Sequence, residues 1–250
     1  MSGLVMGHTQ DWIQMTSTDS KRGSKTVTTK KEDSESDGRA AEDLTVIAHR
    51  GFAGENPENT VAAMEAATEP IPDDDTADGP VRPADIVEID VVPTADGDVV
   101  VFHDHGLSNR DGESDRLTDV EGIVWETDTP TVTDAEVLGS GETVPRLNEV
   151  CEAVPSDVNI NVELKNPGRM DLRFAENLSE ADLTDRVDVW RPFVEQVVNV
   201  LDRFDNEILC SSFCEAAIAV TREISSYPVA PIVWESIDNG VSIAEKHDAE

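Results

Sequence analysis

Short apolar runs alternate with segments of helical periodicity from residue 44 onward. Residues 187–204 repeat apolar side chains every three or four positions, which predicts an amphipathic helix. Asn59 or Thr60 is expected to cap another helix. The runs rich in β-formers predict six strands, at 44–49, 85–92, 98–103, 157–164, 207–213 and 229–236. Strands that alternate with helices predict an α/β fold with a parallel sheet, either a closed barrel or a doubly wound sheet.

The turn after the first predicted strand favours the barrel. It has no glycine-rich nucleotide-binding pattern, so a TIM-type (β/α) barrel is expected over a dinucleotide-binding sheet. Six strands are fewer than the eight of such a barrel. At roughly 30 residues per βα unit, about two units are expected to be missing at the C-terminal end. The resulting sheet edges would aggregate or need a partner.

Two segments lack any apolar period. Residues 1–43 are rich in Ser, Thr, Lys, Asp and Glu, and are expected to form a disordered extension because they offer little surface to bury. The folded domain is therefore predicted to span 44–250. Within it, the acidic, Pro- and Gly-containing residues 69–83 predict a surface loop.

Charge narrows the possible partners. The 250 residues carry 53 Asp and Glu against 19 Lys and Arg, a net charge of -34, and 45 of the acids lie in 44–250. This field would repel nucleic acid and anionic lipid. Lys165 and Lys246 are the only lysines after Lys31. An acidic, lysine-poor folded region that self-repels at low salt predicts a halophilic protein that concentrated salt stabilises.

Location and redox chemistry follow from what the pattern lacks. No apolar run approaches the roughly 18 residues of a membrane span, and the N-terminus does not resemble a secretory signal, so a cytoplasmic location is expected. Cys151, Cys210 and Cys214 form no CxxC pair and are expected to be small buried residues. The sequence does not define an oligomeric state.

Three carboxylates lie near the ends of predicted strands. Glu88 and Asp90 are two positions apart and share one face of their strand. Glu163, near the end of the fourth strand, can join them. Burying them unpaired would be costly, so a bound calcium, magnesium or manganese ion is the simplest remedy. The alternative is that they face outward or pair with arginines.

Histidines and cations occur at the same strand ends. His49 and Arg50 close the first strand, His103 closes the third, and Lys165 follows Glu163 on the same face. Paired histidines suit proton transfer, because the pKa of histidine is close to neutral pH. His105 is expected to be a surface residue. Together these groups suit metal-assisted cleavage of an anionic ester, with a phosphate the natural guess.

Six ordered motifs then match a known family. HRGFAGENPENT, EIDV, FHD, PRL and VELK resemble the signature of the glycerophosphodiester phosphodiesterases, which runs HRG, PENT, ExD, HD, PxL and ExK. The match spans 49–165 and continues weakly into 211–213. The resemblance implies a barrel of the phosphatidylinositol phospholipase C-like group. It also implies hydrolysis of glycerophosphodiesters to glycerol 3-phosphate and an alcohol, with Ca²⁺ or Mg²⁺.

The resemblance also implies a role for each matched residue. His49 and His103 would be the acid and base, with the order open. Arg50 and Lys165 would contact phosphate, and Glu58 and Asn59 of the PENT element would support the site. The metal carboxylates would be Glu88, Asp90 and Glu163. Two alternatives stay open: a truncated, inactive remnant, and a phospholipase-type enzyme acting on a related lipid headgroup.

Overall fold

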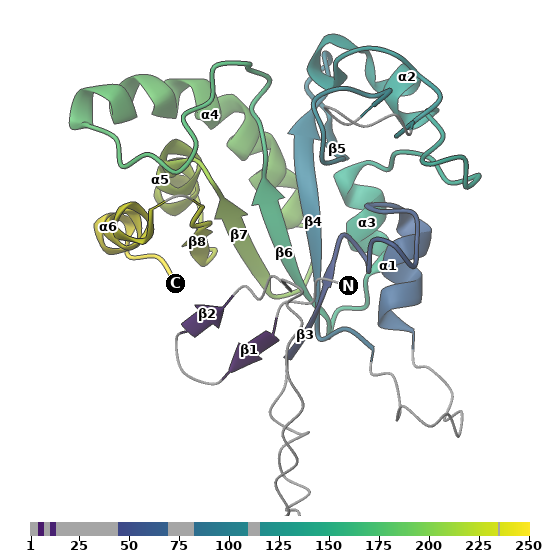
Figure 1. Ribbon diagram of the computed structural model, residues 1–250, viewed down its shortest axis with the longest axis horizontal. Helices are drawn as coiled ribbons and strands as arrows, with labels where there is room; N and C mark the ends of the chain where they lie inside the picture. The colour runs from purple at the N-terminus through teal and green to yellow at the C-terminus, as the bar shows by residue number, and fades with distance from the viewer. Residues whose placement is uncertain (1–4, 8–10, 14–44, 70–82, 110–115, 235) are drawn as a thin grey trace, which may run out of the picture.

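A curled parallel sheet forms the centre of the molecule. The computed structural model describes residues 5–7, 11–13, 45–69, 83–109, 116–234 and 236–250. Neighbouring strands pair in the order β3-β4-β6-β7-β8, with helices packed beside them (Figure 1). Their bounds are Thr45–His49, Ile86–Pro93, Asn159–Leu164, Ile208–Ser212 and Val229–Pro231. The α/β class and these five predicted strands are therefore confirmed, as a half-barrel among the described residues.

The third predicted strand has a different role from the one expected. β5 (Val99–Val101) pairs antiparallel with β4, so it is the second arm of a hairpin and not a strand of the parallel sheet. Gly97 adopts φ +85° in the connecting turn, where its N–H donates to Thr94 O at 3.0 Å. The connection is too short for the crossover that parallel neighbours require. The Asp96-Gly97 pair is the hairpin signal that strand counting overlooked.

Side chains cap the N-termini of α1, α2, α4 and α6. Thr60, not Asn59, caps α1, because its Oγ1 accepts from Ala63 N at 3.2 Å. α4 begins earlier than the predicted residue 187, since Ser179 accepts from Asp182 N and starts the helix there. The helices are α1 Val61–Thr68, η1 Val124–Glu126, α2 Thr129–Thr133, α3 Leu147–Ala153, α4 Glu180–Leu201, α5 Glu215–Ile224 and α6 Ile237–His247. None of these helices is long and apolar enough to cross a membrane.

Strand β4 separates the core from the polar face. Val87, Ile89 and Val91 are fully buried in the main apolar core, together with side chains of α1, α3, α4 and α5. Glu88 and Asp90 alternate with them and therefore lie on the opposite, inner face. A second apolar cluster, built from the end of β4, from β5 and from residues 102–144, forms a small lobe beside the sheet. The alternation of apolar and acidic residues along β4 thus determines which face of the sheet packs against the helices and which face carries the carboxylates.

Two short strands lie inside the segment predicted to be disordered. β1 (Val5–Gly7) and β2 (Asp11–Ile13) form a hairpin, and β1 pairs antiparallel with β3. The edge of β3 offers unpaired backbone groups, and β1 satisfies some of them. The division into 1–43 and 44–250 stays a prediction. The rest of 1–43 and most of the predicted loop 69–83 lie outside the described residues.

Candidate active site

Strand register brings the predicted site residues together at the carboxyl ends of the sheet. His49 of β3 lies directly opposite Glu88 of β4, and Asp90 lies opposite Glu163 of β6. Parallel neighbours align their carboxyl ends, so residues at the ends of different strands meet on one rim. Lys165 follows β6 directly, and its N–H donates to Val91 O at 3.2 Å, which continues the pairing.

Glu88, Asp90 and Glu163 form a buried carboxylate triad. One oxygen from each lies within 4.8 Å of the others, and the residues are 6%, 0% and 7% exposed. Burial, and then the charge of Asp90, raise the pKa of Glu163 to about 7; the same causes raise the pKa of Glu88 well above its usual value. Like charges this close cannot all ionise without a compensating cation.

Arg50 and Lys165 lie against the triad. Arg50 Nε is 3.1 Å from Asp90 Oδ2, and Lys165 Nζ is 2.9 Å from Glu163 Oε1 and 3.6 Å from Asp90 Oδ1. Burial alone would raise the pKa of Asp90, but the charges of His103, Lys165 and Arg50 lower it overall. Pairing with an arginine, the alternative reading of the carboxylates, therefore holds for Asp90.

Compensation by these two cations is incomplete. Arg50 Nε, Asp90 Oδ1 and Glu163 Oε1 are buried at ion-pair distance from an opposite charge, yet none of them makes a hydrogen bond of acceptable geometry. Buried polar atoms are normally hydrogen-bonded in folded proteins. The Asp90 and Glu163 oxygens that lack hydrogen bonds are what an oxygen-ligated cation would complete, so the triad fits a divalent metal.

The turn after β3 is strained and holds Arg50 in place. Arg50 and Phe52 adopt φ of 52° and 61°, a region that residues other than glycine rarely occupy. Between them, Gly51 has φ +74°, and a Cβ there would lie 2.7 Å from Ala63 Cβ. Backbone strain of this kind persists only where the surroundings impose it, commonly at functional sites. Gly51 is therefore required both by its backbone angle and by its contact with α1.

The PENT element braces this turn. Asn59 Nδ2 donates to Asp90 Oδ2 at 2.9 Å, and its backbone N–H donates to Arg50 O at 3.0 Å. Glu58 Oε1 accepts from Arg50 Nη1 at 3.1 Å. Glu58 thus contacts the guanidinium group of Arg50 and does not belong to the carboxylate triad. Both residues act on the site through Arg50 and Asp90.

The two histidines approach the rim from different elements. His49 Nε2 lies 3.8 Å from Glu88 Oε2, and burial, followed by the charge of Arg50, lowers the pKa of His49. His103 follows the hairpin strand β5, and its Nδ1 lies 3.1 Å from Asp104 Oδ2. His103 therefore lies at the same rim. It follows a hairpin strand, and not the parallel strand that the sequence predicted at 98–103.

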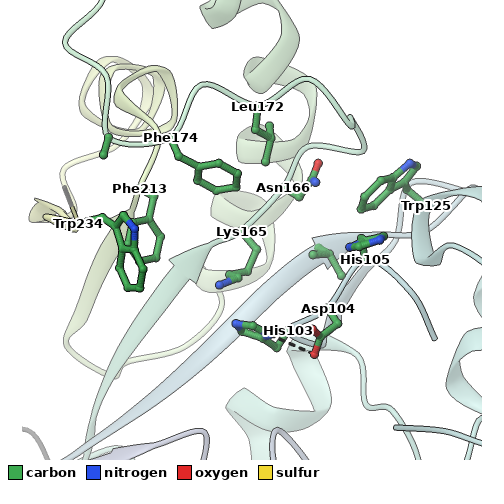
Figure 2. A pocket seen from close by; sticks show the side chains of 12 residues that line it. His103, Asp104, His105, Trp125, Lys165, Asn166, Leu172, Phe174, Phe213 and Trp234 are labelled. Carbon is green, nitrogen blue, oxygen red and sulfur yellow. Dashed lines mark ion pairs between the residues drawn. The ribbon is translucent and has the colours of Figure 1, made fainter. Parts of the chain in front are cut away.

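A pocket of about 510 Å³ opens beside the rim (Figure 2). His103 and Lys165 line it on the side of the triad. His105 faces it with Trp125, and the centroids of their rings are 6.3 Å apart. His105, predicted to be a surface residue, is partly exposed and lines the pocket beside Trp125. Phe174, Phe213 and Trp234 form an aromatic wall opposite, with Phe213 6.2 Å from each of the others, ring centroid to ring centroid.

The sequence analysis did not predict the aromatic wall. Its three residues come from the segments that directly follow β6, β7 and β8. The position of Phe213 directly after a strand was a usable signal, since pockets of β/α proteins are built from such segments. The sequence does not indicate that Phe174 and Trp234 lie beside Phe213.

A buried acidic triad, two cations and two histidines at the carboxyl rim of a β/α sheet define the active-site arrangement of a β/α enzyme. The family comparison agrees. The chain belongs to the glycerophosphoryl diester phosphodiesterase family, whose model matches residues 49–236. That span includes every site residue described above.

Relatives carry related names. The chain is 33% identical over 155 residues to a glycerophosphodiester phosphodiesterase of Bacillus altitudinis, covering 57% of this chain and 55% of that protein. It is 27% identical over 167 residues to a lysophospholipase D of Rattus norvegicus, covering 65% and 49% respectively. The chain thus spans about half the length of these relatives.

A solved structure shares the fold. A phosphodiesterase of Oleispira antarctica, in complex with the product sn-glycerol-3-phosphate, superposes with a TM-score of 0.60 at 25% identity, covering 82% of this chain and 72% of that one. The curled sheet described here is therefore the architecture of a known phosphodiesterase fold.

Proposed function

We propose that the protein hydrolyses glycerophosphodiesters to glycerol 3-phosphate and an alcohol in a metal-dependent reaction. The observation that carries this proposal is the carboxylate triad, which Arg50 and Lys165 contact, with Lys165 also lining the pocket. Family membership and the product named in the Oleispira antarctica complex support the substrate class.

Glu88, Asp90 and Glu163 would hold the divalent ion. Hard oxygen ligands favour Ca²⁺ or Mg²⁺ over softer metals. When bound, such an ion polarises the phosphoryl oxygens and neutralises charge that develops on them. It would also offset the cost of burial and the repulsion by Asp90, which together raise the pKa of Glu88 and Glu163. The proposed chemistry and the uncompensated negative charge of the triad thus both call for a bound divalent ion.

The remaining side chains divide the other tasks. Arg50 and Lys165 would bind the phosphodiester anion through charge-assisted hydrogen bonds. The lowered pKa of His49 keeps its imidazole neutral at neutral pH, which suits the base that deprotonates the glycerol 2-hydroxyl or a water. His103, whose Nδ1 lies 3.1 Å from Asp104 Oδ2, would be the acid that protonates the leaving alcohol. Asn59 and Glu58 would keep Asp90 and Arg50 aligned.

Release of glycerol 3-phosphate tests this function. Purified protein is incubated at high salt with glycerophosphocholine, glycerophosphoethanolamine and glycerophosphoinositol, with Ca²⁺, with Mg²⁺ or with EDTA. We expect turnover with a metal and none with EDTA. Absence of turnover under every metal and substrate would contradict the proposal.

A second candidate has its own support. The similarity to a lysophospholipase D favours a related lipid headgroup as substrate on the same residues. Lysophosphatidylcholine in the same assay separates the two, because the lipid enzyme would release choline from it faster than from glycerophosphocholine. The inactive remnant, an incomplete barrel that keeps the residues, predicts no turnover of either. The cytoplasmic location and the halophilic character remain predictions.

A further inference from the structure

A second buried carboxylate lies outside the triad. Glu215, the first residue of α5, has a fully buried side chain. Its Oε2 accepts from the backbone N–H of Leu178, and its Oε1 lies 2.8 Å from both Lys246 Nζ and His247 Nε2. Burial would raise the pKa of Glu215, but these hydrogen bonds lower it overall. We call Glu215, Lys246 and His247 the clasp.

The choice of Lys246 indicates a specific role. Only two lysines follow Lys31 in the sequence, and the other one, Lys165, contacts the triad. A surface that has replaced lysine with acidic residues gains nothing in solubility from keeping one at 246. Lys246 Nζ also donates to Leu178 O at 3.1 Å, so it contacts both the buried carboxylate and the chain segment that the carboxylate binds.

Leu178 ends the segment that builds one side of the pocket. Residues 165–178 run from the end of β6 to the start of α4 and carry Phe174 and Ala175 to the pocket wall. Ala175 N–H donates to Phe213 O at 2.8 Å, and Asn239 Nδ2 of α6 donates to Ala175 O at 3.1 Å. Helix α6 therefore fastens this segment twice, at Ala175 and at Leu178. Figure 2 shows Phe174 beside Phe213 and Trp234 on that side of the pocket.

We propose that Glu215, together with Lys246 and His247, is a positioning residue that holds the aromatic wall in the geometry that binds the substrate. The clasp touches none of the reacting groups, so its contribution is made to binding and not to bond cleavage. Loss of a side chain that positions only the bound substrate raises KM and leaves kcat unchanged. This inference rests on the proposed function only in taking the pocket as the substrate site.

The experiment compares two carboxylates of one helix. Glu215→Gln is made beside Glu223→Gln, a matched control on α5, where exposed Glu223 pairs with Arg191 of α4. For Glu215→Gln we expect KM to rise about tenfold with kcat within about twofold of the wild type. We also expect faster hydrogen exchange at the amides of Ala175 and Leu178. Glu223→Gln is expected to change neither.

Further variants keep the inference falsifiable. Lys246→Met should reproduce the rise in KM, whereas Lys246→Arg, which retains the charge, should restore most of the affinity. If Glu215→Gln does not fold, Asn239→Ala, which removes only the bond to Ala175 O, is expected to raise KM in the same direction. An unchanged KM in folded Glu215→Gln, or a fall in kcat alone, would overturn the inference. If the wild type shows no turnover, the proposed function fails, while the exchange measurement still decides the role of the clasp.

Discussion

The triad and the clasp are both buried carboxylate clusters, yet their electrostatics are opposite. In the triad, oxygens of Asp90 and Glu163 lack hydrogen bonds, and the pKa of Glu163 is raised. In the clasp, both oxygens of Glu215 are bonded and its pKa is lowered. Buried charges that are fully paired hold a structure together, whereas underpaired ones are a cost that a ligand can relieve. The contrast distinguishes the triad, a candidate ligand-binding site, from the clasp, a structural contact.

The largest expected effect is the loss of turnover when either histidine beside the triad is replaced. His103→Asn and His49→Asn should each lower kcat by about 10²- to 10⁴-fold, because each removes a proton donor or acceptor from the reaction. Metal binding should persist in both variants, since neither histidine belongs to the triad; isothermal titration with Ca²⁺ or Mg²⁺ measures it. Either variant with near wild-type kcat would remove that histidine from the mechanism.

Metal-free stability gives the next largest effect, and its sign depends on the cluster. The raised pKa of Glu163 means that the folded state keeps a proton that the unfolded state releases above pH 4.5. Stability must therefore fall as pH rises from about 4.5 to 7, by up to about 3 kcal/mol. Glu163→Gln, which carries no titrating charge, should be more stable than the wild type at pH 8 in EDTA.

Chemical denaturation at pH 5 and pH 8, with and without EDTA, measures this difference. Saturating Ca²⁺ or Mg²⁺ should stabilise the wild type at pH 8 and stabilise Glu163→Gln much less. A Glu163→Gln variant that is less stable than the wild type in EDTA at pH 8 would show that the triad is already neutralised by Arg50 and Lys165.

The same substitution in the clasp should have the opposite sign. Glu215→Gln removes the negative partner of Lys246 and His247 and weakens the bond to Leu178, so we expect a loss of about 1 to 3 kcal/mol. Because the pKa of Glu215 is lowered, its contribution is present above its unfolded value and is lost as pH falls through the folded one. The deficit of Glu215→Gln should therefore be larger at pH 8 than at pH 3, as measured by denaturation.

How far the sequence predicted these two clusters differs for a physical reason. Glu88 and Asp90 alternate on one strand, and Glu163 ends a parallel neighbour, so strand periodicity was enough to bring them together. Glu215 and His247 are 32 residues apart on helices whose relative rotation no periodicity specifies. The clasp therefore could not be predicted from spacing.

The fold was predictable to a similar extent. Apolar runs located the parallel strands, because a buried strand needs an apolar sequence whatever its neighbours are. They did not give the direction of β5, which depends on the Asp96-Gly97 turn, or the place of His105 at the pocket, where its ring contacts Trp125. Local hydrophobicity predicts that a segment is buried, and turns and packing decide where it lies.

Surface charge gives the smallest expected effect per group. Exposed carboxylates repel one another weakly, at about 1 kcal/mol or less per pair, and salt screens them. Summed over a net charge of -34, this repulsion should make the melting temperature rise between 0.1 M and about 2 M KCl. The deficit of Glu215→Gln should stay nearly constant over that range, because salt screens buried pairs much less. A melting temperature independent of KCl would contradict the halophilic interpretation, and a Glu215→Gln deficit that vanished in salt would place the clasp among the surface charges.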